Sequence, residues 1–115
     1  MTQEDRTIPV FVAPGYDSLF NVLTRALEQA QGGKGKERHA QPGQAFEDQP
    51  IIQIGKLIGM GFQTGQAIKK AVEAQGMARR GDFNAAEREI LGAINYLAAV
   101  AIEINQRATA QLKDQ

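Results

Sequence analysis

Hydrophobic residues recur at intervals of three and four along residues 51–77, the spacing that places side chains on one face of an α-helix. The positions with this spacing are Ile51, Ile54, Ile58, Phe62, Gly65, Ile68 and Val72. Pro50 suits the first turn of such a helix, because the N–H that proline lacks would have no partner there. Arg79 and Arg80 suit its last turn, and Gly81 follows them. The pattern predicts a long helix between residues 50 and 81.

Four glycines interrupt this predicted helix, and each costs about 0.5–1 kcal/mol relative to alanine. They are Gly55, Gly59, Gly61 and Gly65. One explanation is close approach of another helix, because glycine lets two backbones come together. The other is a break at residues 59–61, which would start a second helix near Phe62 with free N–H groups that could meet an anion. We favour close packing as the commoner use of small residues, and the break stays open.

A first helix is predicted earlier in the chain, after the turn at Gly15. Asp17 or Ser18 is a suitable N-cap, and the glycines at residues 32–33 would end the helix. Its apolar face consists of Leu19, Leu23, Ala26 and Ala30, with Phe20 and Leu27 beside them.

The last helix is predicted from about residue 85 to residue 112, with Asn84 as its N-cap and Glu87 completing a capping box. Its apolar stripes are Ile90, Ile94, Leu97, Ala101, Ile104 and Ala108; Leu91, Ala98 and Ile102; and Tyr96 and Val100. Between residues 91 and 102 the helix is apolar almost all round, and such a helix is buried on more than one side. Two other helices barely suffice to cover it, so we expect a homo-oligomer.

Two segments lack a helical pattern. Residues 7–14, TIPVFVAP, predict an extended segment or a short edge strand, since Pro9 cannot donate a hydrogen bond to a ladder. Residues 32–50 predict an irregular loop that is basic in its first half and acidic in its second. The sequence therefore predicts one all-α domain over residues 1–115. It has three helices, a short extended N-terminal segment over residues 1–15 and a long glycine-rich loop after the first helix.

The amino-acid composition excludes several classes of function. The 115 residues carry a formal net charge of zero, so the overall charge gives no strong nucleic-acid or membrane signal. Cysteine is absent, which excludes disulfides and thiol catalysis. The N-terminus lacks the features of a signal peptide, and the longest apolar run, near residues 97–102, is too short to span a bilayer. We expect a soluble cytoplasmic protein.

The basic loop is the first candidate binding site. Residues 32–39 combine three glycines with the charged side chains of Lys34, Lys36, Arg38 and His39. Glycines allow backbone N–H groups to turn toward an anion, and lysine and arginine supply charge, so this loop suits a phosphate group. The loop carries no G-x-x-x-x-G-K-[ST] motif and follows a helix rather than a strand. The alternative is a solvated connecting loop.

Polar side chains on the two long helices are the second candidate. A ligand could be bound jointly by Gln66, Lys69, Lys70 and Asn95. The alternatives are surface roles for the lysines, a local pair between Lys70 and Glu73, and a hydrogen bond between helices or subunits made by a buried Asn95.

The acidic residues predict no catalytic metal site. Glu87 and Glu89 are two apart and face different ways on a helix, and Glu73 and Glu103 stand alone. The only serine, Ser18, is expected to cap a helix. We therefore predict no catalytic residue, no metal and no cofactor.

The run EREILGAINYLAAVAIEI resembles the last core helix of the all-α nucleoside triphosphate pyrophosphatases, the MazG-like family. The resemblance implies a helical bundle, a dimer or tetramer, magnesium and nucleotide hydrolysis. Glu89 matches the start of the family's helix, but Gly92 stands where the next acid would align. Lysines occupy the preceding helix where the family carries an acidic pair.

A second resemblance covers about residues 34–102. The segments GKGKERHA, FEDQPI, GFQTGQAIKK and ILGAINYLAA look like those of small proteins encoded by tailed bacteriophages. The third is also similar to a helical phage family labelled nucleotide-kinase-like. This resemblance implies a phage accessory protein in the host cytoplasm that modulates a host enzyme or a defence system.

Three functions follow from these patterns. The first is a non-catalytic oligomeric protein that binds a phosphate-bearing small ligand, a nucleotide or a nucleotide signal, with counter-defence as its context. The second is a MazG-like nucleotide pyrophosphohydrolase. The third is a protein-interaction module that inhibits a host protein.

Overall fold

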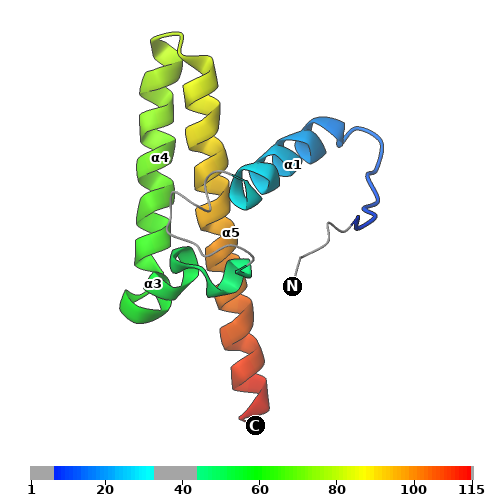
Figure 1. Ribbon diagram of the computed structural model, residues 1–115, viewed down its shortest axis with the longest axis vertical. Helices are drawn as coiled ribbons and strands as arrows, with labels where there is room; N and C mark the ends of the chain where they lie inside the picture. The colour runs from blue at the N-terminus through cyan, green and yellow to red at the C-terminus, as the bar shows by residue number, and fades with distance from the viewer. Residues whose placement is uncertain (1–6, 33–43, 115) are drawn as a thin grey trace.

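The computed structural model describes residues 7–32 and 44–114, and these residues are all-α, as the sequence predicts. Their elements are α1 (Asp17–Gln31), the 3-10 turn η1 (Phe46–Asp48), α3 (Pro50–Ile58), α4 (Gly61–Arg79) and α5 (Phe83–Lys113) (Figure 1). No strand occurs in the described part of the chain; residues 7–13 have no regular secondary structure, and a turn follows at residues 14–15. None of the described helices is both long enough and apolar enough to cross a bilayer.

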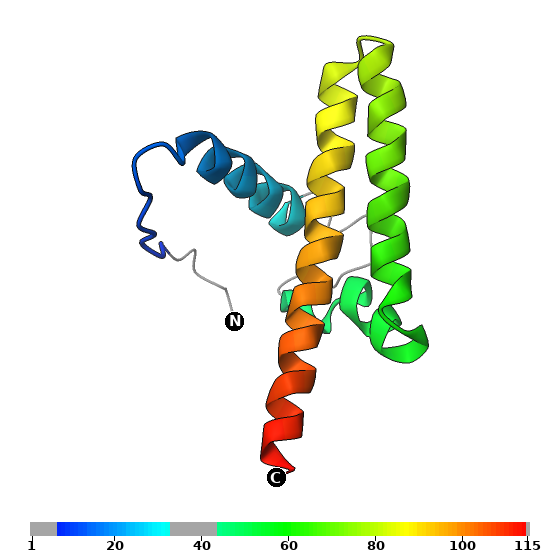
Figure 2. The same ribbon diagram turned by 180° about the vertical axis from the view of Figure 1, so that it is seen from behind.

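The centre of the fold is a hairpin of the two longest helices, α4 and α5, which lie side by side along most of α4 (Figures 1 and 2). Small residues are frequent among the buried positions of both helices. They are Ala67 and Ala74 of α4 and Ala86, Gly92, Ala93 and Ala99 of α5. Alanine favours a helix, and its short side chain lets two helices approach closely. The turn between the helices places Gly81 at a φ of 83°.

The predicted long helix is broken, and both explanations for its glycines hold at different positions. Gly59 has a φ of 104°, a conformation that a residue with a Cβ rarely adopts, and α3 ends there. At Gly55 the reason is close approach, because the side chain of Gln63 from α4 lies directly against its backbone.

The break also overturns the predicted apolar face of residues 51–72. Of the seven positions, Ile54, Ile58, Gly65, Ile68 and Val72 are exposed. The chain changes direction at Gly59, so one periodic face cannot continue from α3 into α4. The buried residues are instead Ile51, Ile52 and Gly55 in α3 and Gln63, Ala67 and Ala74 in α4.

The main apolar core lies where α3 crosses the hairpin. Ile51 and Ile52 of α3 are almost fully buried there, together with Ala67 of α4 and Ala93, Tyr96 and Ala99 of α5. Phe62 adds an edge-to-face contact with Tyr96, with the ring centroids 6.2 Å apart. α3 begins at Pro50, as predicted, and η1 packs against it.

α1 packs against α5 through its C-terminal half, and its N-terminal half projects away from the hairpin (Figures 1 and 2). Only Ala26 and Ala30 of its predicted apolar face are buried. The other members of that face, Leu19, Phe20, Leu23 and Leu27, are exposed.

The predicted N-caps are also wrong. Tyr16 precedes α1 and Asp82 precedes α5, and neither side chain caps its helix by a hydrogen bond. α5 begins at Phe83, so Asn84 lies inside the helix. The side chain of Glu87 bonds to Arg25 of α1.

Candidate functional site

The eight predicted ligand residues fall into two groups. Lys34, Lys36, Arg38 and His39 lie outside the described residues. Gln66, Lys69 and Lys70 lie on α4, and Asn95 lies on α5.

Lys70 takes part in the contact between α4 and α5. Its Nζ lies 3.5 Å from Oε2 of Glu89, and both side chains are about four-fifths buried. The same Nζ lies 6.0 Å from the centroid of the Tyr96 ring, within the range of a cation–π contact. The lysine stem crosses α5 at Gly92, where a Cβ atom would stand 3.1 Å from Cδ of the lysine. The absence of a side chain at Gly92 therefore gives Lys70 its path to Glu89.

Lys69, rather than Lys70, pairs with Glu73. The distance from its Nζ to Oε1 of Glu73 is 3.7 Å, and the lysine side chain is 66% exposed. The alternative of a local pair between Lys70 and Glu73 is wrong, because Lys70 points toward α5. An exposed pair of this length contributes little to stability, about 0.2–1 kcal/mol at most, and leaves the ammonium accessible to solvent.

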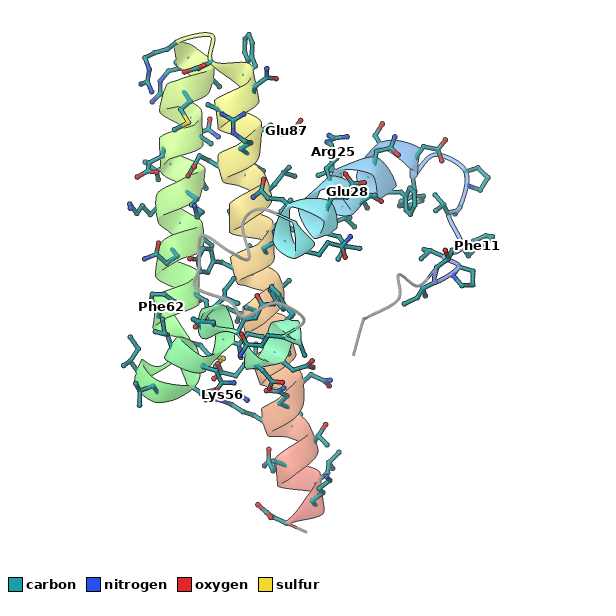
Figure 3. The ribbon with its side chains drawn as sticks, in the orientation of Figure 1. Phe11, Arg25, Glu28, Lys56, Phe62 and Glu87 are labelled. Carbon is teal, nitrogen blue, oxygen red and sulfur yellow. The ribbon has the colours of Figure 1, made fainter. Side chains whose placement is uncertain are left out.

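Asn95 joins α1 to α5. Its side chain is buried, and its Nδ2 donates a hydrogen bond of 3.0 Å to the backbone carbonyl of Ala26. This is the hydrogen bond between helices that the sequence offered as one alternative. The same junction carries an ion pair on its outer side, where Nε of Arg25 lies 3.0 Å from Oε1 of Glu87 (Figure 3).

The four glutamates named from the sequence are each ion-paired. Glu87 and Glu89 face different helices, as their spacing predicts, and pair with Arg25 and Lys70. Glu73 and Glu103 pair with Lys69 and Arg107. Across residues 7–32 and 44–114, no three His, Asp or Glu side chains gather into a possible metal site.

Sequence reasoning missed a buried polar cluster at the end of the hairpin next to α3. Gln63 is 0% exposed and Glu103 is 1% exposed. Nε2 of Gln63 lies 3.4 Å from Oε1 of Glu103, and a terminal nitrogen of Arg107 lies 2.5 Å from the other carboxylate oxygen. The spacing of Glu103 and Arg107, four apart on a helix, was the available signal. Because the cluster ties α4 to α5, its evident role is to hold the hairpin.

Two of the exposed apolar surfaces of the described chain lie on helices that pack against each other, α1 and α5. The first, which we call the arm face, consists of Leu19, Phe20, Leu23 and Leu27 on α1, and these side chains are 40–57% exposed. The second, which we call the α5 stripe, consists of Ile90, Ile94, Leu97, Ala101, Ile104 and Ala108. Leu97 and Ile104 are each 52% exposed, and Ala101 and Ala108 are also exposed. Both surfaces had the periodicity of buried faces in the sequence.

Comparison with protein-family models, with curated protein sequences and with solved structures finds no match to this chain. The function must therefore be argued from its own residues.

Proposed function

We propose that this protein is the subunit of a homo-oligomer and acts as a self-assembled binding protein rather than through a catalytic centre. The observation that carries the proposal is the arm face. α1 is fixed to α5 by a buried hydrogen bond from Asn95 and an ion pair from Arg25, yet its four large apolar side chains are about half exposed. A helix that is anchored in this way and apolar on its free face is typical of an element that docks on a partner.

The exposed apolar side chains support a second copy of the chain as that partner. The arm face and the α5 stripe both leave large apolar side chains about half exposed. Most soluble oligomers are built from identical subunits, so a chain with more than one exposed apolar surface suits self-association.

For the ligand of the assembly we propose a phosphate-bearing small molecule, a nucleotide or nucleotide signal. Support comes from the basic glycine-rich sequence of residues 32–39 and from Lys69, whose ammonium is exposed and only weakly paired. Hydrolysis of that nucleotide is less well supported. Where the resemblance to MazG-like enzymes aligns an acid, the chain has Gly92 with the stem of Lys70 across it.

Light scattering coupled to size-exclusion chromatography tests the assembly. At micromolar concentration, we expect the protein to show at least twice the chain mass of 12.5 kDa. Leu23→Asp places a charge on the arm face and should weaken association by about tenfold or more, equivalent to about 1.4 kcal/mol. The matched control is Asn21→Asp, which adds the same charge at another exposed position of α1 and should leave the mass unchanged.

The helix content of both variants is measured by circular dichroism, so that loss of assembly is not confused with unfolding. A wild-type monomer at these concentrations would overturn the proposal. In that case the arm face would need a different protein as its partner.

A further inference from the structure

α5 offers three apolar faces, and the chain covers two of them. One face, with Tyr96 and Ala99, is buried in the core formed with α3 and α4. A second, where Leu91 and Asn95 are buried, carries the hydrogen bond from Asn95 to α1. The third is the α5 stripe, of which Leu97 and Ile104 are half exposed. The apolar face without a partner in the chain therefore lies on α5, the helix that α1, α3 and α4 all contact.

The spacing along the α5 stripe is that of a helix that packs against another helix. Successive members, from Ile90 to Ala108, are separated by four, three, four, three and four residues. An alternation of three and four is the repeat of 3.5 residues found in coiled coils. Because this series of intervals reads the same in both directions, two copies of the stripe can align antiparallel over their full length.

The sizes of the side chains favour the antiparallel alignment. It sets Leu97 against Ala101 and Ile90 against Ala108 of the other copy, so that a large side chain faces a small one. The layer between these two sets Ile94 against Ile104. A parallel alignment would set each alanine against itself and leave space at both layers, and unfilled space in an apolar interface lowers stability.

The position of α5 in the fold agrees with this alignment. Its C-terminal end extends beyond α3 and α4 (Figures 1 and 2), and from Ile104 to Asp114 every residue except Gln106 is exposed. A helical end of about ten residues is marginal in water without packing. In an antiparallel pair, this end lies along Ile90 and Ile94 of the other copy, which are only half buried in one chain.

We propose that α5 pairs in antiparallel orientation with α5 of a second copy through the α5 stripe. This inference rests on the proposed self-association and names the surfaces that meet. The arm face then lies outside the pair and is free to join further copies.

The chain contains no cysteine, so disulfide trapping tests the pairing cleanly. Ile90→Cys and Ala108→Cys are made in separate chains. Residues 90 and 108 are about 27 Å apart along a helix, far more than a disulfide spans. In an antiparallel pair, neither variant should crosslink alone, and the co-refolded mixture should form disulfide dimers. The pair Ile94→Cys and Ile104→Cys should behave in the same way, because these residues are about 15 Å apart along the helix.

Gln75→Cys, at an exposed position of α4, is the control for random collision and should not crosslink. Circular dichroism and light scattering on each variant before oxidation confirm that it keeps the fold and the mass of the wild type. Crosslinking of each variant alone would show a parallel pair and overturn the inference.

Absence of all crosslinks would also overturn it. If the variants still have an oligomeric mass, assembly uses another surface and the proposed function stands. If the wild type is a monomer, both the inference and the proposed function fail.

Discussion

The side chain of Gln63 occupies the space that a Cβ atom at Gly55 would need. Nε2 of Gln63 lies only 1.8 Å from the ideal position of that atom. Gln63 itself is fully buried and reaches Glu103 with the same nitrogen. The absence of a side chain at Gly55 therefore allows the polar contact that Gln63 makes between α4 and α5.

Gly55→Ala should destabilise the fold by about 1–3 kcal/mol, because a buried amide has no room to move aside. Gly65→Ala is the matched control. It lies inside α4 with open space around it, so alanine should stabilise the helix by about 0.5–1 kcal/mol. Urea denaturation of the two variants and the wild type measures both effects. Equal stability of the two variants would contradict the close approach at Gly55.

Asn95→Ala should loosen α1. The change removes the hydrogen bond between Asn95 and the carbonyl of Ala26, at a cost of about 0.5–1.5 kcal/mol. Hydrogen exchange of the α1 backbone should become faster, while exchange in α4 changes little. Asn105→Ala, at an exposed position of the same helix, should leave α1 protected. Unchanged exchange in the Asn95 variant would mean that α1 is held by other contacts.

Glu103→Ala should destabilise the hairpin by about 1–3 kcal/mol, since it leaves the buried amide of Gln63 without an acceptor. Arg107 is more than half exposed, so its charge can turn to water and adds less to the cost. Glu73→Ala removes an exposed pair and should change stability by less than about 0.5 kcal/mol. Thermal unfolding of both variants measures the difference, and a larger effect at Glu73 would be the contrary result.

Magnesium-dependent hydrolysis of nucleoside triphosphates is expected to be absent. The carboxylate of Glu89 is paired with the ammonium of Lys70. Position 92 is a glycine, so it offers no second carboxylate beside Glu89. The measurement is release of pyrophosphate or phosphate with and without magnesium. Turnover that disappears in Glu89→Gln or Glu73→Gln would restore the pyrophosphatase interpretation.

Lys36→Ala combined with Arg38→Ala should weaken binding of a phosphate-bearing ligand by about a hundredfold or more. Each charge-assisted hydrogen bond contributes about 1.5–3 kcal/mol. Binding should also weaken with added salt, because exposed charges are screened. A thermal-shift screen of linear and cyclic nucleotides finds the ligand, and calorimetry compares the double variant with the wild type. Full affinity in that variant would mean that the loop only connects two helices. Gln66 and Lys69 would then be the candidate ligand site.

The sequence by itself determined the all-α class and some of the helix ends. Period, proline and glycine are local signals, so Pro50 marked the start of α3, Gly81 the turn between α4 and α5, and the all-α class followed. The sequence also predicted the unusually apolar surface of α5, because that surface depends only on apolar residues that recur three and four positions apart. These features need no knowledge of what lies across the chain.

Only the tertiary structure decided which apolar faces are covered and which polar residues meet. A change of direction at Gly59 exposed Ile68 and Val72, although their spacing matched a buried face. The partner of Lys70 became Glu89, nineteen positions away, because the hairpin brings α5 against α4 and Gly92 leaves a path between them. The spacing of apolar residues shows that a helix face can be buried. The residues that bury it belong to elements distant in the sequence, or to another copy of the chain.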